Sequence, residues 1–180
     1  KILYSWGVND YYQLGYRYLN STRVFSQVNF EPLRFRLPTN NTRVHKVCAS
    51  GRHWVALTYE DDSTSSSSTS PTDPFASRSV FDLTVIGSNK LGTLGIGSDQ
   101  TLSSAASPLR TQQGIATDCA VGDFHTMFIN NNRRASGTGQ NSDGRAGFGL
   151  LQSSSTFNPA SIGSFIAKVY SGAKTTFFIA

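Results

Sequence analysis

The sequence predicts an all-β protein in which short antiparallel strands are joined by polar turns. Only 15% of its 180 residues are charged, whereas 12 Phe, 7 Tyr and 16 Gly stand out. Aromatic residues favour strands, and glycine-rich polar segments favour the turns between them. No window combines a helical period with capping signals at both ends, and no apolar run is long enough to cross a bilayer as a helix. The composition therefore favours a repeated β architecture.

A glycine-rich motif recurs three times along the chain and indicates an internal repeat. It has the form Gly-x-Asn-x-x-Gly-x-x-Gly, with Tyr12 in place of the middle glycine in the first copy. The other motif residues are Gly7, Asn9 and Gly15, then Gly87, Asn89, Gly92 and Gly95, then Gly139, Asn141, Gly144 and Gly147. Glycines at this spacing permit positive φ and close backbone approach, and asparagine can bond its own backbone. We expect three equivalent turns between strands.

Each glycine motif is followed by a proline and then by a second landmark, a glycine that precedes a short apolar run. The prolines Pro38, Pro108 and Pro159 precede Gly51, Gly122 and Gly172 by thirteen or fourteen residues. The apolar runs cover residues 54–57, 126–129 and 176–179. A small sheet built from such a unit cannot bury both faces alone, so the units must stack. Sheets stacked around a shared axis form a β-propeller, which is the fold that we expect.

The repeats resemble those of the regulator of chromosome condensation (RCC1-like) family, which read roughly W-G-x-N-x-x-G-Q-L-G, then a proline, then A-x-G-x-x-H-T-x-x-L. The residues that carry the resemblance are Trp6, Gly7, Asn9, Gln13, Leu14 and Gly15 in the first copy, and Cys119, Gly122, His125 and Thr126 in the second. The third copy diverges most, with Thr138 in place of the tryptophan and Thr175 in place of the histidine. The first copy has Trp54 at the histidine position, with His53 one residue early. The resemblance implies an all-β propeller of RCC1-like repeats.

The repeats divide the chain into four parts. Residues 1–58 form a first repeat or blade with an insertion at 16–37, and residues 59–80 form a Ser-rich flexible linker. Residues 81–130 and 131–180 form the second and third repeats or blades. Relatives of this kind usually have seven blades, so three visible blades imply that the others lie in further sequence of the protein or in a partner.

The insertion at 16–37 mixes aromatic and basic residues, which are frequent in protein interfaces. The candidate partner-binding residues are Tyr16, Arg17, Tyr18, Arg23, Phe25, Arg34, Phe35 and Arg36. Two interpretations are open. The insertion is either a specialised docking loop, or its aromatic residues belong to the outer strands of the first blade.

The sequence offers no catalytic, metal-binding or cofactor-binding set of residues. His45, His53 and His125 have no metal-ligand spacing, and no carboxylate pair suggests acid–base chemistry. We expect His125 and the motif asparagines to be structural. Cys48 and Cys119 stand at equivalent repeat positions, three residues before a glycine, so we expect packed thiols and no disulfide. Two cysteines favour an intracellular compartment, without distinguishing cytoplasm or cytoskeleton, nucleus and mitochondrion.

These observations favour a non-catalytic scaffold that mediates protein–protein interactions within a larger intracellular assembly. A guanine-nucleotide exchange factor for a small GTPase is an alternative that the resemblance allows. The net charge of +5, concentrated in the first repeat, keeps a chromatin or ribonucleoprotein role open, for example with a mitochondrial ribosome. An inhibitor of a bacterial hydrolase would need secretion. We expect protein partners and no membrane, with nucleic acid as the weaker possibility.

Overall fold

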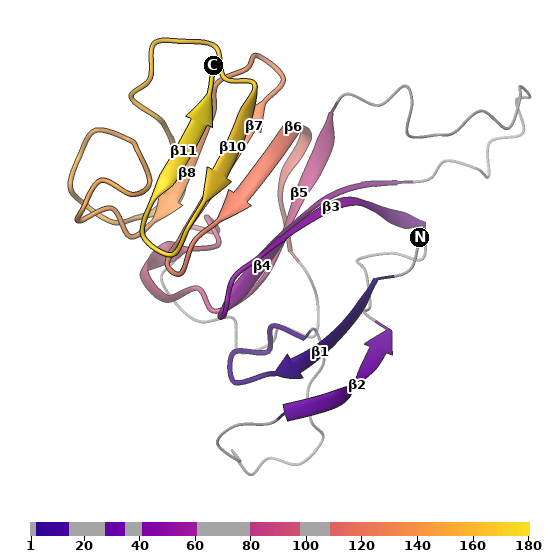
Figure 1. Ribbon diagram of the computed structural model, residues 1–180. Helices are drawn as coiled ribbons and strands as arrows, with labels where there is room; N and C mark the ends of the chain where they lie inside the picture. Colours follow the sequence, from indigo (N-terminus) through magenta and orange to yellow (C-terminus); the bar gives the residue numbers. More distant parts are fainter. Residues whose placement is uncertain (1–2, 15–27, 35–40, 61–79, 98–108) are drawn as a thin grey trace, which may run out of the picture.

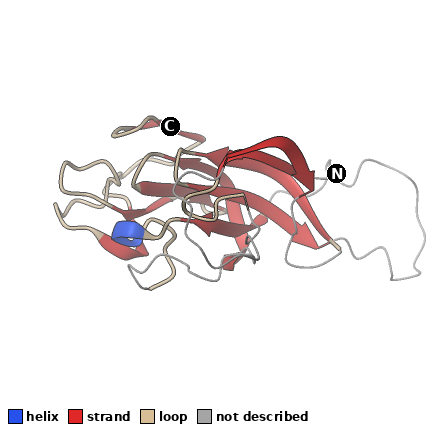
Figure 2. Cartoon of the chain, turned by 90° about the horizontal axis from the view of Figure 1, so that it is seen from below, coloured by secondary structure: helices blue, strands red, loops and turns tan. Residues whose placement is uncertain are grey.

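A computed structural model describes residues 3–14, 28–34, 41–60, 80–97 and 109–180. Strands make up nearly all of the regular structure, and the described residues contain one turn of 3-10 helix (Figure 2). The Ser-rich segment and most of the 16–37 insertion lie outside the described residues. Within the described part there is no helix with the length and apolarity needed to cross a bilayer. The prediction of an all-β fold is confirmed.

The described strands are labelled in chain order in Figure 1. In chain order they are β1 (Tyr4–Val8), β2 (Val28–Arg34), β3 (Thr42–Ala49), β4 (His53–Glu60), β5 (Phe81–Gly87), β6 (Leu109–Val121), β7 (His125–Asn130), β8 (Ala135–Gly139), β9 (Ser154–Pro159), β10 (Lys168–Ser171) and β11 (Thr176–Ile179). The helical turn η1 (Lys90–Gly92) follows β5. The hydrogen-bonded pairs among these described strands are all antiparallel.

The long strand β6 belongs to two sheets. Its first part pairs with β5, where Leu109 faces Val85, and its last part pairs with β7, where Val121 faces Thr126. Ala116 pairs with both Phe81 on β5 and Asn130 on β7, and Gly114, two residues earlier, has a positive φ of 58°. The connected order β3-β4-β5-β6-β7-β8-β9 is therefore two four-stranded sheets that share β6. The hairpins β1-β2 and β10-β11 stand on either side of this pair.

The sheets do not coincide with the sequence repeats. The first four-stranded sheet takes β3 and β4 from the first repeat, and β5 and the start of β6 from the second. The second takes the end of β6 and β7 from the second repeat, and β8 and β9 from the third. The expectation that each repeat forms its own sheet is corrected accordingly. Sharing sheets between repeats ties each repeat to the next through backbone hydrogen bonds.

The apolar cores lie between successive sheets. In β4, Val55 and Leu57 face the core next to β6 and β7, whereas Trp54 and Ala56 face the opposite core. In β7, Phe128 packs toward the first of these cores, and its neighbours face a third core that includes residues of the β10-β11 hairpin. Alternate residues of a strand point to opposite faces, so these strands are buried on both sides. This explains the apolar runs at 54–57 and 126–129.

The three asparagine motifs form equivalent turns. The side-chain oxygens of Asn9, Asn89 and Asn141 accept hydrogen bonds from the backbone N–H five residues later, at 2.9, 2.9 and 2.7 Å. The sixth motif position has a positive φ of 60° in Tyr12, 76° in Gly92 and 78° in Gly144. Glycine adopts this conformation freely, whereas a residue such as Tyr12 does so at a cost. The same backbone therefore forms in all three copies, including the one without the glycine.

Candidate functional site

The buried histidine His53 connects the first four-stranded sheet to the second. Its Nε2 lies 2.9 Å from Oγ1 of Thr126, and that hydroxyl donates to the carbonyl oxygen of Thr93 at 2.7 Å. A hydroxyl has one hydrogen, so it can donate to the carbonyl only if it accepts from the histidine. The network therefore assigns the proton of His53 to Nε2. We call this histidine–threonine–carbonyl arrangement an inter-sheet latch.

The same arrangement recurs one sheet further along. Nε2 of His125 lies 2.9 Å from Oγ1 of Thr176, which donates to the carbonyl oxygen of Arg145 at 2.7 Å. In the first repeat, Trp54 stands where Thr126 stands in the second, and its Nε1 donates to the carbonyl oxygen of Gln13 at 2.7 Å. The tryptophan thus satisfies the turn carbonyl without offering a hydroxyl to a histidine.

The strand register corrects the alignment expected from the sequence. Ser50, Gly122 and Gly172 are equivalent, because the N–H of each donates to the carbonyl of the residue three positions later, at 2.9 to 3.0 Å. His53 therefore occupies the histidine position, and Trp54 occupies the threonine position. Gly51 lies outside this pattern. Glycine identity is a misleading guide to the register here, because a serine takes the glycine's place in the first repeat.

Both latch histidines are neutral in the folded protein. Burial lowers the pKa of His53 to about 3, and His125 acts in the same direction. Burial lowers the pKa of His125 to about 4, aided by the positive charge of Arg145. Nδ1 of His53 lies 3.1 Å from the hydroxyl of Ser50, whereas Nδ1 of His125 is buried without a hydrogen-bond partner among the described residues. These groups hold sheets together and are poorly suited to exchange protons near neutral pH.

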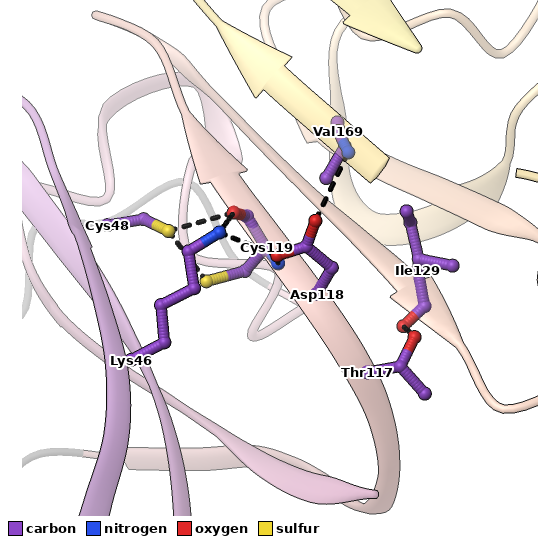
Figure 3. A network of polar contacts seen from close by, with 7 residues as sticks. All are labelled: Lys46, Cys48, Thr117, Asp118, Cys119, Ile129 and Val169. Carbon is purple, nitrogen blue, oxygen red and sulfur yellow. Dashed lines mark hydrogen bonds and ion pairs between the residues drawn. The ribbon is translucent and has the colours of Figure 1, made fainter. Parts of the chain in front are cut away.

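A polar junction around the buried Asp118 joins three successive sheets (Figure 3), and the Lys46 side chain in it is 39% exposed. Oδ1 of Asp118 lies 2.6 Å from Nζ of Lys46 on β3, and Oδ2 accepts from the N–H of Val169 on β10 at 3.2 Å. Lys46 also donates to the carbonyl of Cys119 at 3.2 Å. Although burial acts against it, the hydrogen bond to Asp118 raises the pKa of Lys46. The junction therefore contains a stable ion pair between strands of different sheets.

The two cysteines meet at this junction. Sγ of Cys48 lies 2.8 Å from Sγ of Cys119, and both are free thiols. The register makes Cys48 equivalent to Ala120, so the two cysteines are not at equivalent repeat positions. Adjacent strand residues point to opposite faces. This offset of one residue is why the two thiols face each other across the space between the sheets.

Two exposed regions could contact partners. The first is a groove of about 500 Å³ beside β1, lined by residues that include Trp6, Val8, Val47 and Trp54. The exposed face of β1 carries Trp6, which is 61% exposed. Apolar side chains at a surface groove are typical of sites that bury another chain or a ligand.

The second region is a basic-aromatic patch formed by Arg133, Arg134 and Phe165. The Phe165 ring is 59% exposed, and the guanidinium carbons of Arg133 and Arg134 lie 5.9 and 5.1 Å from its centroid. Nη1 of Arg134 donates to the carbonyl of Gly163 at 2.9 Å, which fixes the arginine beside the ring. No sequence motif marks this patch, because the arginines and the phenylalanine lie in separate loops.

The structure leaves the predicted docking loop untested. Of the candidate residues, Arg34 ends β2, where it pairs with Tyr4 of β1. The remaining candidates lie outside the described residues: Tyr16, Arg17, Tyr18, Arg23, Phe25, Phe35 and Arg36. Across the described part of the chain, no group of three or more His, Cys, Asp or Glu residues could hold a metal ion.

Comparison with known proteins finds one matching family model and several solved structures of similar fold. The family model described as the regulator of chromosome condensation (RCC1) repeat matches residues 2–57. Human WBSCR16 is 21% identical with a TM-score of 0.68, over 94% of this chain and 38% of that one. Yeast RCC1 (Prp20), in its complex with Kap60, is 18% identical with a TM-score of 0.72, over 97% of this chain and 37% of that one.

A further structure is that of Prp20p from Saccharomyces cerevisiae, described together with its binding properties to Gsp1p and histones. It is 17% identical with a TM-score of 0.71, over 98% of this chain and 39% of that one. No curated protein matches the chain in sequence. The chain spans 37 to 39% of the length of these three structures. At these identities the likeness is one of fold.

Proposed function

We propose, from the premise that this chain is an RCC1-like repeat protein with the propeller fold, that it acts as a non-catalytic scaffold for protein partners in a larger assembly. The observation that carries the proposal is the basic-aromatic patch of Arg133, Arg134 and Phe165. Arginine and aromatic residues are the side chains that most often dominate binding energy in protein interfaces. The intracellular compartment expected from the cysteine content stays a prediction.

The use of polar groups inside the protein supports the same proposal. The latch histidines, the motif asparagines and the Lys46–Asp118 pair are engaged in contacts between sheets or within turns. Large apolar side chains are instead available at the surface, where Trp6, Phe165 and Phe177 are each more than half exposed. A protein that commits its polar groups to internal contacts and displays aromatic side chains is suited to binding other proteins.

The relatives add support of a limited kind. Yeast RCC1 (Prp20) was solved bound to Kap60, and Prp20p was described with binding properties to Gsp1p and histones. These partners belong to that protein, and we propose only that a similar fold serves protein recognition here. Guanine-nucleotide exchange on a small GTPase is the second candidate, favoured by the fold that the chain shares with yeast RCC1.

Affinity purification of the tagged, intact protein tests the scaffold proposal. We expect a multiprotein complex that survives gel filtration, and we expect Phe165→Ala to lower its recovery several-fold. The matched control is Leu151→Ala, because Leu151 is 70% exposed but lies outside the patch. Circular dichroism of both variants checks that each remains folded. A wild-type protein that elutes alone, or equal losses in both variants, would refute the scaffold role of this patch.

The same preparation distinguishes the alternatives. Faster release of labelled nucleotide from a small GTPase, at catalytic amounts of the protein, would replace the scaffold proposal with exchange activity. Recovery that is lost after nuclease treatment, or that falls steeply with salt, would instead indicate a nucleic-acid-linked role, because phosphate contacts weaken strongly as salt increases.

A further inference from the structure

We propose that Cys48 and Cys119 form an oxidisable dithiol site, which a peroxide converts into a disulfide between two successive sheets. The proposal rests on the position of the two thiols. They come from β3 and β6, are 71 residues apart in sequence, and have their Sγ atoms 2.8 Å apart (Figure 3). A disulfide needs a separation of about 2 Å, so bond formation requires a shift of about 1 Å or less.

The contact between the thiols is fixed by their surroundings. Sγ of Cys48 also donates to the carbonyl oxygen of Cys119 at 2.8 Å, which holds the first thiol over the backbone of the second. Lys46 lies two residues before Cys48 on β3, and it binds both the carbonyl of Cys119 and the carboxylate of Asp118. The ion pair thus fastens the two strands together beside the two sulfur atoms. The folded protein therefore holds the two sulfur atoms in contact, so no large movement of the chain is needed before they react.

The two thiols differ in exposure and in acidity. Cys48 is partly exposed, whereas Cys119 is fully buried. The hydrogen bond from Cys119 lowers the pKa of Cys48 against the effect of burial, and the charge of Lys46 lowers it further. The hydrogen bond to Cys48 and burial together raise the pKa of Cys119 well above its ordinary value. Cys48 is therefore the thiol that reacts first, and Cys119 is the thiol that completes the disulfide.

The oxidation balances with hydrogen peroxide as the oxidant. The Cys48 thiolate attacks one peroxide oxygen, the O–O bond breaks, and the departing hydroxide takes up the thiol proton to leave as water. Cys48 is then a sulfenic acid. Cys119 next attacks the sulfur of Cys48, the S–O bond breaks, and the hydroxide leaves with the Cys119 proton as a second water. Two thiols lose two electrons in total, and one peroxide becomes two waters.

Peptide mapping of the intact protein tests the proposal. The reduced protein is treated with hydrogen peroxide, free thiols are blocked with N-ethylmaleimide, and the protein is digested with trypsin without reductant. Cleavage at Lys46, Arg52, Arg110 and Arg133 places the two cysteines in peptides 47–52 and 111–133. We expect these peptides to be joined, and a dithiol reductant to separate them. We expect the native protein to form the link at least about tenfold faster than protein unfolded in guanidinium, because the fold holds the thiols together.

Two single variants assign the roles of the thiols. In Cys119→Ser, the sulfenic acid at Cys48 has no thiol to react with, so dimedone should trap it. In Cys48→Ser, Cys119 should stay unmodified at the same peroxide dose. Met127, the chain's only methionine, is fully buried and lies in peptide 111–133, so its oxidation reports unfolding of the sample.

Several results would overturn the proposal. One is that both thiols stay reactive toward N-ethylmaleimide at peroxide doses that already oxidise Met127. Another is that the linked peptides form no faster in the native protein than in the unfolded one. A third is that the link joins two different chains, which non-reducing electrophoresis would show as a dimer.

Discussion

The latch histidines His53 and His125 show how a titratable side chain becomes a structural one. Nε2 of each histidine donates a hydrogen bond to a threonine hydroxyl. That hydroxyl in turn donates a hydrogen bond to a turn carbonyl of the neighbouring sheet. A buried hydroxyl in this position satisfies a donor and an acceptor at once. Removing it leaves both groups unpaired, and unpaired buried polar groups are costly.

Thr126→Val tests the latch with little change in shape. The variant leaves Nε2 of His53 and the carbonyl of Thr93 without their hydroxyl partner. We expect the free energy of unfolding to fall by about 2–4 kcal/mol, measured by denaturant titration. Thr175→Val, at an exposed position, should change it by less than about 0.5 kcal/mol. Equal effects in the two variants would contradict the latch.

The depressed histidine pKa values predict that acid destabilises the fold. In the unfolded chain His53 takes up a proton near its ordinary pKa of 6.5, but in the folded protein it does so only near pH 3. The unfolded state therefore binds more protons between these values, and stability that is complete above pH 6.5 is lost as the pH falls. We expect His53 to contribute a loss of about 2 kcal/mol between pH 6.5 and 5.

Unfolding titrations at pH 7 and pH 5 measure this loss, and His53→Gln should make the pH dependence shallower. His45→Gln is the matched control, because His45 is exposed. A pH dependence that stays as steep in His53→Gln as in the wild type would refute the assignment.

At the level of single residues, the sequence predicted turn positions better than contacts. The asparagine and glycine spacing identified the three turns, because their chemistry is local. The exchange of roles between His53 and Trp54 was missed, because it depends on which carbonyl each N–H reaches. The Cys48–Cys119 contact was missed for the same reason: a one-residue difference in register decides which face of a strand carries the thiol.

The asparagine turns illustrate how one element is used in different surroundings. Gly92 and Gly144 occupy the same position with φ values of 76° and 78°. A Cβ on Gly92 would collide with the backbone of Ser155 on β9, whereas a Cβ on Gly144 would meet nothing within 4 Å. Glycine at this motif position is thus required for packing in the Gly92 turn, but only for the backbone conformation in the Gly144 turn.

This pair of glycines gives a prediction at the level of the element. Gly144→Ala should cost about 1 kcal/mol of unfolding free energy, from the positive φ alone. Gly92→Ala should cost about 3 kcal/mol or more, because the turn or β9 must also move. Thermal and denaturant unfolding measure both, and each variant serves as the control for the other. Equal costs would show that the contact between η1 and β9 is unimportant.

Strand β6 shows what sequence patterns could not reveal about elements. Apolar runs predicted strands at β4, β7 and β11, because each run is short and bounded by turn residues. The sharing of β6 between two sheets could not be predicted, since pairing partners are distant in sequence. The residue at which the strand passes from one sheet to the next, Ala116, lies outside every repeated landmark.

At the scale of the whole molecule, Asp118 connects three sheets. It pairs with Lys46 on β3, accepts from Cys119 on its own strand, and accepts from Val169 on β10. Asp118 is only 3% exposed, so these hydrogen-bond partners replace water around the carboxylate almost completely. Asn in its place would turn an amide donor toward one of these donors.

Asp118→Asn should lower the free energy of unfolding by about 1–3 kcal/mol, because the amide leaves one of the buried donors that bind Asp118 without an acceptor, whereas the Lys46 side chain is 39% exposed and can regain water. Denaturant titration measures the loss, and hydrogen exchange should show the N–H groups of β10 opening more often. Asp10→Asn, which changes an exposed carboxylate, is the control. An unchanged exchange rate in β10 would show that Asp118 does not couple the sheets.

The predicted propeller fold was correct at this scale because three landmarks in a fixed order demand stacked units. The assignment of whole sheets to single repeats was wrong, because each four-stranded sheet takes its strands from two successive repeats. The basic-aromatic patch was not foreseen, since loops far apart in sequence bring its residues together.

The latches also give the repeats a direction. The first repeat supplies a latch histidine, but it has Trp54 where the second repeat has Thr126. The third repeat supplies the latch threonine Thr176, but it has Thr175 where the second has His125. Only the second repeat carries both halves, so only it can be duplicated in tandem and still bond to its own copy. Exchanging the order of the outer two repeats would break both connections.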